Sequence, residues 1–153
     1  MTLRKELKNW YGDDHADLRE ELARYGAENG NPIDSFANIK CKCGSDLFEL
    51  QTDEDAGVAI RTCSQCQTEH LMGDSADYLA DAEPEPHECN CRHDSFQIVV
   101  GVHRYRDEDH DDKLSDDVRW LYIGCRCPKC SLLGCYADWK NEFEGYRKLL
   151  RRM

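Results

Sequence analysis

The pattern of apolar and polar residues alternates most clearly between positions 96 and 122. Two segments there carry an apolar side chain at every second position, and a period of two is typical of half-buried antiparallel strands. These positions are Phe96, Ile98, Val100 and Val102 in the first segment, and Val118, Trp120 and Tyr122 in the second. The pattern therefore predicts a long hairpin of two antiparallel strands.

Shorter apolar segments precede this hairpin. Residues 47–50 and 58–62 predict a smaller hairpin around the acidic turn at 52–57. Third strands are expected at 67–72 and 132–136, where strand-like sequence follows a pair of cysteines. Each hairpin would then belong to a three-stranded unit.

The N-terminal part of the chain has a helical period instead. The first apolar residues have helical spacing and are Leu3, Leu7, Trp10 and Tyr11. A second helical segment follows, with Asp13 or Asp14 as its cap and Gly26 at its end. Its apolar face consists of Leu18, Leu22 and Tyr25.

An amphipathic helix is also expected at the C-terminal end, over residues 139–153. Asp138 can cap it, because an Asp side chain accepts hydrogen bonds from the first backbone N–H groups of a helix. The apolar face of this helix would consist of Trp139, Phe143, Tyr146 and Leu150.

Cysteines supply the most specific chemistry. The chain has ten, and eight of them form four close pairs: Cys41/Cys43, Cys63/Cys66, Cys89/Cys91 and Cys127/Cys130. The N-terminus is charged and lacks the apolar stretch of a signal peptide, which predicts a cytoplasmic location. Because the cytoplasm disfavours structural disulfides, clustered cysteines there more often bind a metal ion.

The pairs belong to an internal repeat. Cys41-Lys-Cys43-Gly-Ser-Asp-Leu-Phe48 matches Cys89-Asn-Cys91-Arg-His-Asp-Ser-Phe96 at both cysteines, the Asp and the Phe. Each copy continues through strand-like sequence to a C-x-x-C pair, and eight positions later to Asp74 or Asp138. The second copy is longer, because 35 residues separate its cysteine pairs instead of 19.

Two turns that each carry two cysteines can supply four thiolates to one ion, which is the closed tetrahedral set of structural zinc. The repeat favours one Zn²⁺ per copy, with ligands Cys41, Cys43, Cys63 and Cys66 in the first and Cys89, Cys91, Cys127 and Cys130 in the second. An interleaved scheme that mixes the pairs is the alternative. Iron shares the same thiolate geometry, but the spacings match no familiar iron–sulfur run. His70 and His87 are alternative ligands near the cysteines.

The chain resembles the zinc-ribbon, rubredoxin-like superfamily in its paired cysteines around hairpins, over residues 41–79 and 89–138. It is also similar to small uncharacterised bacterial proteins with two C-x-C…C-x-x-C zinc ribbons. The resemblance implies a small antiparallel sheet with a metal ion at one end of each copy. The first pair of each copy departs from common ribbons, because it is C-x-C instead of C-x-x-C.

The expected fold is therefore a small α+β metal-stabilised fold, with two antiparallel β zinc ribbons flanked by N-terminal and C-terminal helices. The parts of the chain follow from the motifs. They are an N-terminal helical segment and linker at 1–35, a first ribbon at 36–80, a linker at 81–88, a second ribbon at 89–138 and a C-terminal helix at 139–153.

Charge narrows the classes of partner. The formal net charge is −11, and eight bound thiolates with two Zn²⁺ would bring it to about −15. A protein that binds nucleic acid needs a basic surface to contact the phosphates. The one clear basic cluster in this sequence is explained more simply by the favourable interaction of basic side chains with the C-terminus of a helix. It consists of Arg147, Lys148, Arg151 and Arg152. No apolar run approaches the roughly 20 residues that span a bilayer.

An enzyme is not expected. Four thiolates close the coordination sphere of zinc, whereas catalytic zinc keeps an open position. The chain has no phosphate-binding loop, no H-E-x-x-H motif and no Ser/His/Asp spacing. Cys125 and Cys135 remain outside the ligand sets and are either two small buried side chains or a candidate redox pair.

The second copy contains an acidic insert at 104–119, with seven acidic and four basic residues. We expect it to project as a mobile, negatively charged arm, because it has few apolar groups to bury. The candidate partner-binding residues are Asp107, Glu108, Asp109, Asp111 and Asp112. A negative surface attracts a basic protein and speeds its association.

Three functions therefore compete. The preferred one is a non-catalytic zinc-binding module that binds another protein of basic charge, for example as an immunity or antitoxin-type protein. The alternatives are a nucleic-acid-associated, transcription-type zinc ribbon and a sensor of redox state or zinc.

Overall fold

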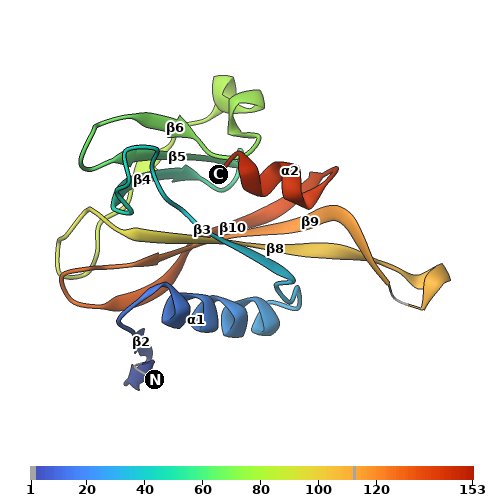
Figure 1. Cartoon of the computed structure of the whole chain (residues 1–153), viewed down its shortest axis with the longest axis horizontal. Coiled ribbons are helices and arrows are strands. Elements are labelled where there is room, and N and C mark those ends of the chain that lie inside the picture. The colour runs from blue at the N-terminus through green and yellow to red at the C-terminus, as the bar shows by residue number, and fades with distance from the viewer. Residues whose placement is uncertain (1–2, 112) are drawn as a thin grey trace.

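The computed structural model describes residues 3–111 and 113–153 as three stacked layers. A six-stranded sheet forms the middle layer, a long helix covers one face of it, and a four-stranded sheet with a short helix covers the other (Figure 1). Within the described residues the chain is an α+β protein whose strand pairs are antiparallel. None of the helices described is long and apolar enough to cross a membrane.

The six-stranded sheet has the strand order β1-β2-β10-β9-β8-β3. Its strands are β1 (Arg4–Glu6), β2 (Asn9–Tyr11), β3 (Ser35–Asn38), β8 (Gln97–Asp107), β9 (Lys113–Arg126) and β10 (Leu132–Phe143). The four-stranded sheet has the order β6-β5-β4-β7. Its strands are β4 (Phe48–Asp53), β5 (Val58–Cys63), β6 (Glu69–Leu71) and β7 (Glu85–Pro86).

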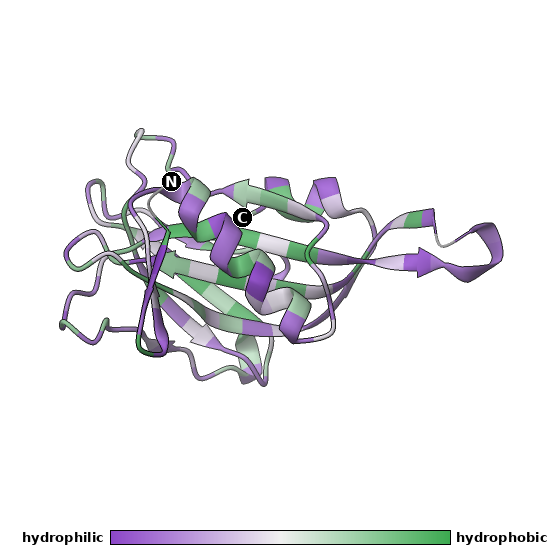
Figure 2. Ribbon diagram, turned by 90° about the horizontal axis from the view of Figure 1, so that it is seen from below, coloured by the Kyte–Doolittle hydropathy of each residue, from purple (hydrophilic) through white to green (hydrophobic). Residues whose placement is uncertain are grey.

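Two α-helices and three 3₁₀ turns complete the fold of the described residues. They are α1 (His15–Glu28), α2 (Tyr146–Arg151), η1 (Ser75–Asp77), η2 (Leu79–Asp81) and η3 (Glu108–His110). Figure 2 shows α1 lying across the face of the six-stranded sheet. There Leu18 and Leu22 are buried against Val99, Tyr122 and Leu133.

The predicted three-stranded units are present in both repeats. In the first, β4, β5 and β6 follow one another, and in the second, β8, β9 and β10 do so. Each unit has a C-x-C pair before its first strand and a C-x-x-C pair at the turn between its second and third strands.

The two repeats share one hydrophobic core. Phe48 and Phe96, which occupy the same place in their repeats, are fully buried within it. The Phe48 N–H donates to the Phe96 carbonyl at 2.9 Å, and the Phe96 N–H donates back to the Phe48 carbonyl at 2.8 Å. This is an isologous contact, in which equivalent residues of two copies meet each other. The two repeats therefore pack against each other and do not form separate domains.

The N-terminal segment is a hairpin, so the prediction of a helix at residues 3–11 is wrong. β1 and β2 meet at Leu7, whose φ of 56° and 98% exposure place it at the turn. β2 in turn pairs with β10, with Trp10 opposite Leu133. Pairing with a strand more than 120 residues away in the chain outweighs the local helical spacing.

The first helix begins as predicted and ends later than predicted. Asp14 caps α1 by accepting a hydrogen bond from the Asp17 N–H at 2.9 Å. The helix passes through Gly26 and ends at Glu28. A Cβ at Gly26 would lie 2.9 Å from Cγ1 of Ile33, so the glycine permits the close approach of the following segment instead of ending the helix.

The C-terminal helix is shorter than predicted, because β10 extends to Phe143 and α2 begins only at Tyr146. Asp138 is therefore not a cap. It lies within β10, where its carboxylate accepts hydrogen bonds from Tyr25 Oη at 2.9 Å and Trp120 Nε1 at 3.0 Å. The edge of β9 offers β10 a ladder of hydrogen bonds as far as Val118, and this pairing keeps residues 139–143 extended.

The remaining linkers are also partly ordered into strands. The segment at 29–35 leads into β3, which pairs with β8, and the segment at 81–88 contains β7, which pairs with β4. Val118 differs from its predicted face. It packs in the shared core, whereas Trp120 and Tyr122 pack on the α1 side. An irregularity of the β8–β9 register between these positions shifts the alternation.

The shared core gives a prediction for stability. Replacing Phe48 or Phe96 with Ala is expected to lower the free energy of unfolding by about 3–5 kcal/mol, because each ring is fully buried between the repeats. Urea unfolding of the purified protein measures this change, and a single transition is expected. The matched control is Tyr78→Ala, which removes an aromatic ring that is 52% exposed and should change stability by less than about 0.5 kcal/mol. Two separate transitions for the wild-type protein would contradict a shared core.

Candidate metal centres

The cysteines of each repeat come together as one cluster of four. In the first cluster, Cys41 and Cys43 precede β4, Cys63 ends β5, and Cys66 lies in the turn before β6. Cys41 Sγ lies 3.6 Å from Cys66 Sγ, and Cys43 Sγ lies 3.6 Å from Cys63 Sγ. All four sulfurs lie within 4.8 Å of one another.

The second cluster repeats this arrangement. Cys89 and Cys91 precede β8, and Cys127 and Cys130 lie between β9 and β10. Cys89 Sγ lies 3.5 Å from Cys130 Sγ, and Cys91 Sγ lies 3.6 Å from Cys127 Sγ. The structure therefore has the sequential grouping of ligands, and the interleaved alternative does not occur in it.

The same backbone turn presents the C-x-C pair in both repeats. The Cys41 N–H donates to the Ser45 carbonyl at 2.8 Å, and the Cys89 N–H donates to the His93 carbonyl at 2.8 Å. The residue after the second cysteine has a positive φ in each, 97° at Gly44 and 74° at Arg92. Glycine adopts this conformation without cost, whereas it is uncommon for an arginine.

The C-x-x-C turns also match. The Cys63 N–H donates to the Thr68 carbonyl at 3.0 Å, and the Cys127 N–H donates to the Leu132 carbonyl at 3.0 Å. One residue after each C-x-x-C has a positive φ, 64° at Gln67 and 69° at Ser131. The backbone thus sets the direction of all eight thiols in the same way in both repeats.

The spacing of the sulfurs fits a tetrahedral metal ion. A thiolate–metal bond of about 2.3 Å in a regular tetrahedron separates the sulfurs by about 3.8 Å. The four closest sulfur pairs stand 3.5–3.6 Å apart, and four thiols at this spacing leave room for one ion at their centre. Each cluster could therefore hold one metal ion with four thiolate ligands.

Backbone N–H groups favour the thiolate form at specific positions. The Cys66 N–H lies 3.5 Å from Cys63 Sγ and, as the largest influence, helps to lower the pKa of Cys63 to about 6. The His93 N–H does the same for Cys91 and lowers its pKa to about 7. Burial instead raises the pKa of Cys89 to about 12. Metals bind thiolates, so these backbone N–H groups favour the form of Cys63 and Cys91 that a metal ion would take.

Burial distinguishes inner from outer ligands. Cys41, Cys63, Cys89 and Cys127 are buried, whereas Cys43 and Cys66 are exposed and Cys91 and Cys130 are half-buried. The inner cysteines belong to the shared hydrophobic core. Each cluster therefore lies at the rim of the core, where it fixes two inner and two outer points of the chain. This position suits a structural role.

The two histidines considered as alternative ligands lie elsewhere. His70 Nε2 is 2.6 Å from the Arg152 carbonyl, and His87 Nε2 is 2.6 Å from Thr52 Oγ1. Neither belongs to a cluster. Thr68 also contributes to the first cluster, because its Oγ1 lies 3.2 Å from Cys66 Sγ and its hydroxyl lowers the pKa of that cysteine. A hydroxyl residue two positions after the last cysteine is the sequence signal for it.

Cys125 and Cys135 are not brought together. Cys125 is fully buried in the shared core, whereas Cys135 packs with the residues under α1 on the opposite face of the sheet. Cys125 lies opposite Gly134, and Cys135 lies opposite Gly124, in the pairing of β9 with β10. The two cysteines therefore belong to neighbouring residue pairs, whose side chains point to opposite faces of the sheet. Burial raises the pKa of both thiols. A direct disulfide would need the sheet to rearrange, so these features support two small packed side chains.

The acidic arm is partly anchored. Its outer end holds Asp107, Glu108, Asp109 and Asp111, while Asp112 lies outside the described residues. The base packs on the body, however, because Val118 is fully buried and Arg106 pairs with Asp34 at 2.8 Å. The expectation that the whole of 104–119 stands free is therefore wrong for its base.

Comparisons with protein families, with curated proteins and with solved structures found no match. The class of protein is therefore defined by the fold and the clusters alone. It is a small α+β protein with two four-cysteine sites, an arrangement that fits tandem zinc ribbons.

Metal content tests the clusters directly. The purified wild-type protein should contain two tightly bound metal ions per chain, because it has two complete ligand sets. The variants Cys43→Ser and Cys91→Ser should each lose one ion, whereas Cys125→Ser, which removes a thiol outside both clusters, should retain two. Elemental analysis measures this. A wild-type chain with no more than one ion would show that the clusters are not metal sites.

Thermal unfolding separates ligands from packed cysteines. Cys63→Ser should lower the Tm by more than about 10 °C, because it removes a ligand whose binding energy is also folding energy. Cys135→Ser replaces a half-buried thiol and should lower the Tm by no more than about 4 °C. Equal losses in the two variants, measured by circular dichroism, would mean that the ligand assignment is incorrect.

Proposed function

We propose that each cluster holds a structural Zn²⁺ ion. Zinc binds four thiolates in a closed tetrahedron without redox chemistry, and the matching turns of the two repeats present such a set twice. Each repeat is about 40–50 residues long, near the size at which an apolar core alone rarely suffices. Bound zinc contributes roughly 10–16 kcal/mol of apparent binding energy that is also folding energy.

The proposed activity is binding of another protein, without catalysis. A closed tetrathiolate ion has no open position for substrate or water. The chain has 31 acidic and 20 basic residues, and bound thiolates add to the negative charge. A field of this sign speeds encounter with a basic protein and discourages nucleic acid.

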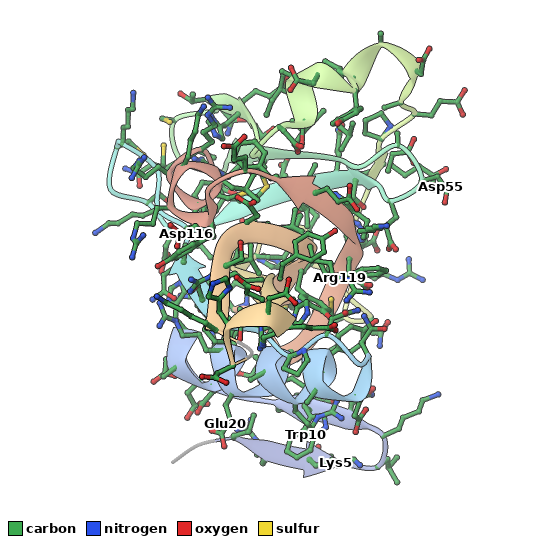
Figure 3. The ribbon with its side chains drawn as sticks, turned by 90° about the vertical axis from the view of Figure 1, so that its right-hand side faces the viewer. Lys5, Trp10, Glu20, Asp55, Asp116 and Arg119 are labelled. Carbon is green, nitrogen blue, oxygen red and sulfur yellow. The ribbon has the colours of Figure 1, made fainter. Side chains whose placement is uncertain are left out.

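The observation that carries the proposal is the acidic hairpin that projects from the body. Figures 1 and 2 show the ends of β8 and β9 extending beyond the other elements, and Figure 2 shows that their outer residues are mostly hydrophilic. Figure 3 looks at the molecule from the side of this arm. The rigid sheet holds the base in place, so that the acidic end is presented to a partner.

An immunity or antitoxin-type protein is one concrete form of this function. Such a protein would neutralise a basic nuclease by occupying its positively charged surface. Small size and strong acidity support this form. The nucleic-acid alternative depends on the basic residues of α2, where Arg147 already lies 3.9 Å from Asp116 of β9.

Removing the charges of the arm tests the role in recognition. The arm variant replaces Asp107, Glu108, Asp109, Asp111 and Asp112 with Ser. It should retain wild-type metal content and Tm, because the described members of this set are at the exposed end of the hairpin. Its association rate with a basic partner captured from the native host should fall about tenfold at low salt, and less at high salt where charges are screened.

The matched control replaces Asp13, Glu20, Glu28, Asp46 and Glu49 with Ser, which removes the same number of charges from the body. If both variants associate equally slowly, only net charge matters and the arm has no special role. An arm variant that binds at the wild-type rate across ionic strengths would refute a role in recognition.

A further inference from the structure

Two hollows flank the acidic turn between β4 and β5. One has a volume of about 460 Å³ and lies between this turn and β10. The other, of about 620 Å³, lies between the same turn and β7. Glu54 and Asp55 line both, and Figure 3 shows Asp55 at the outer end of the turn. We name the first hollow the β10 pocket.

The β10 pocket is strongly negative. Its acidic lining residues are Glu54, Asp55, Asp74 and Glu142, and its one basic lining residue is Lys140, which is paired with Glu142 at 3.2 Å. The neighbouring hollow adds Asp53, Glu83 and Glu85 without any Lys or Arg. Burial raises the pKa of Asp74. A bound cation would compensate this concentration of carboxylates.

Two polar atoms at the same pocket lack hydrogen-bond partners. Trp139 is 7% exposed and Asn141 is 5% exposed, and both line the pocket. Within the described part of the chain, Trp139 Nε1 and Asn141 Oδ1 are two of only three buried side-chain atoms without a partner. The amide of Asn141 is held in place by its Nδ2, which donates to Asp74 Oδ1 at 3.0 Å. An unpaired buried polar atom costs about 1–3 kcal/mol.

Gly57 lets the turn lie close against the indole of Trp139. Its φ of 73° is a conformation that glycine adopts readily. A Cβ at this position would lie 3.3 Å from Trp139 Nε1, so any other residue would crowd the N–H group. The wall of the pocket at the turn therefore consists of backbone and an indole donor.

These groups define the chemistry of a ligand. The carboxylates require a cation, the indole N–H requires an acceptor and the Asn141 oxygen requires a donor. A metal ion would face the N–H unfavourably, and a polyamine has donors but no acceptor. An anion would be repelled by the carboxylates. A peptide with a basic side chain satisfies all three, because its backbone supplies both a carbonyl and an N–H.

We propose that the β10 pocket binds an arginine-containing segment of a basic protein. The guanidinium lies among Glu54, Asp55 and Glu142, while the backbone next to it pairs with Trp139 and Asn141. Arginine suits the site better than lysine, because its planar fork can pair with two carboxylates and stack on Tyr78, which is 52% exposed. This inference rests on the proposed function, for which it names the recognised group.

A short peptide probes the pocket without the native partner. The probe is acetyl-Gly-Arg-Gly-Arg-Gly-amide, and its counterpart with citrulline in place of arginine has the same shape without charge. Calorimetry with the zinc-loaded full chain at low salt should show binding of the arginine peptide, with the citrulline peptide at least tenfold weaker. Spermine should also bind more weakly, because it cannot accept a hydrogen bond from the indole.

Two pocket variants locate the binding. Glu142→Gln removes a carboxylate that is 60% exposed, and it should weaken peptide binding about tenfold. Trp139→Phe removes the indole N–H and should weaken binding about fivefold. Because the smaller ring also leaves a cavity in the shared core, the stability of this variant is measured alongside its binding. The matched control is Glu20→Gln on α1, which removes one exposed charge on the other side of the six-stranded sheet and should change binding less than twofold.

Equal losses from Glu142→Gln and Glu20→Gln would overturn the pocket. Spermine binding as tightly as the peptide, with no effect of Trp139→Phe, would also overturn it. These results would indicate attraction by net charge alone. If the peptide fails to bind while a basic protein still associates through the arm, the pocket is refuted and the proposed function stands. If the peptide binds as described and no basic protein partner is found, the pocket stands and the proposed function fails.

Discussion

Four thiols held against one another at the end of each hairpin are the arrangement on which the rest of the structure depends. The closest sulfurs stand 3.5–3.6 Å apart. Two thiolates at that distance repel each other by roughly 5 kcal/mol at an effective dielectric constant of about 20. A divalent cation at their centre turns this repulsion into attraction, so that the four cysteines can ionise together. Such an ion would tie the loop before the first strand of each repeat to the turn after its second strand.

The shared core extends this constraint from each cluster to the whole chain. Phe48 and Phe96 follow the C-x-C pairs by the same number of residues, and they pair with each other through two backbone hydrogen bonds. A metal ion that positioned one phenylalanine would thus also support the surface on which the other packs. The acidic turn between β4 and β5 lies against β10 of the other repeat, so the same packing also builds the proposed binding pocket.

Features with a local cause could be predicted from the sequence, and features with a distant cause could not. The cysteine grouping and three strands of each repeat follow from short-range spacing. Local spacing predicts helices at Trp10 and Trp139, but both lie in strands that pair with distant partners. The β10 pocket was missed for a related reason. Its residues come from separate segments around Glu54, Asp74 and Asn141, and no local pattern marks an indole N–H that lacks a partner.

Stepwise return of zinc to the metal-free chain is the most direct test of the central claim, which is that the clusters hold the fold together. Bound zinc and β-sheet content would be followed in the same sample by chelator competition and circular dichroism. We predict that the metal-free chain is largely unfolded and that β-sheet content rises with bound zinc until two ions are bound. A metal-free chain with the same sheet content and the same urea midpoint as the zinc-loaded protein would contradict the account.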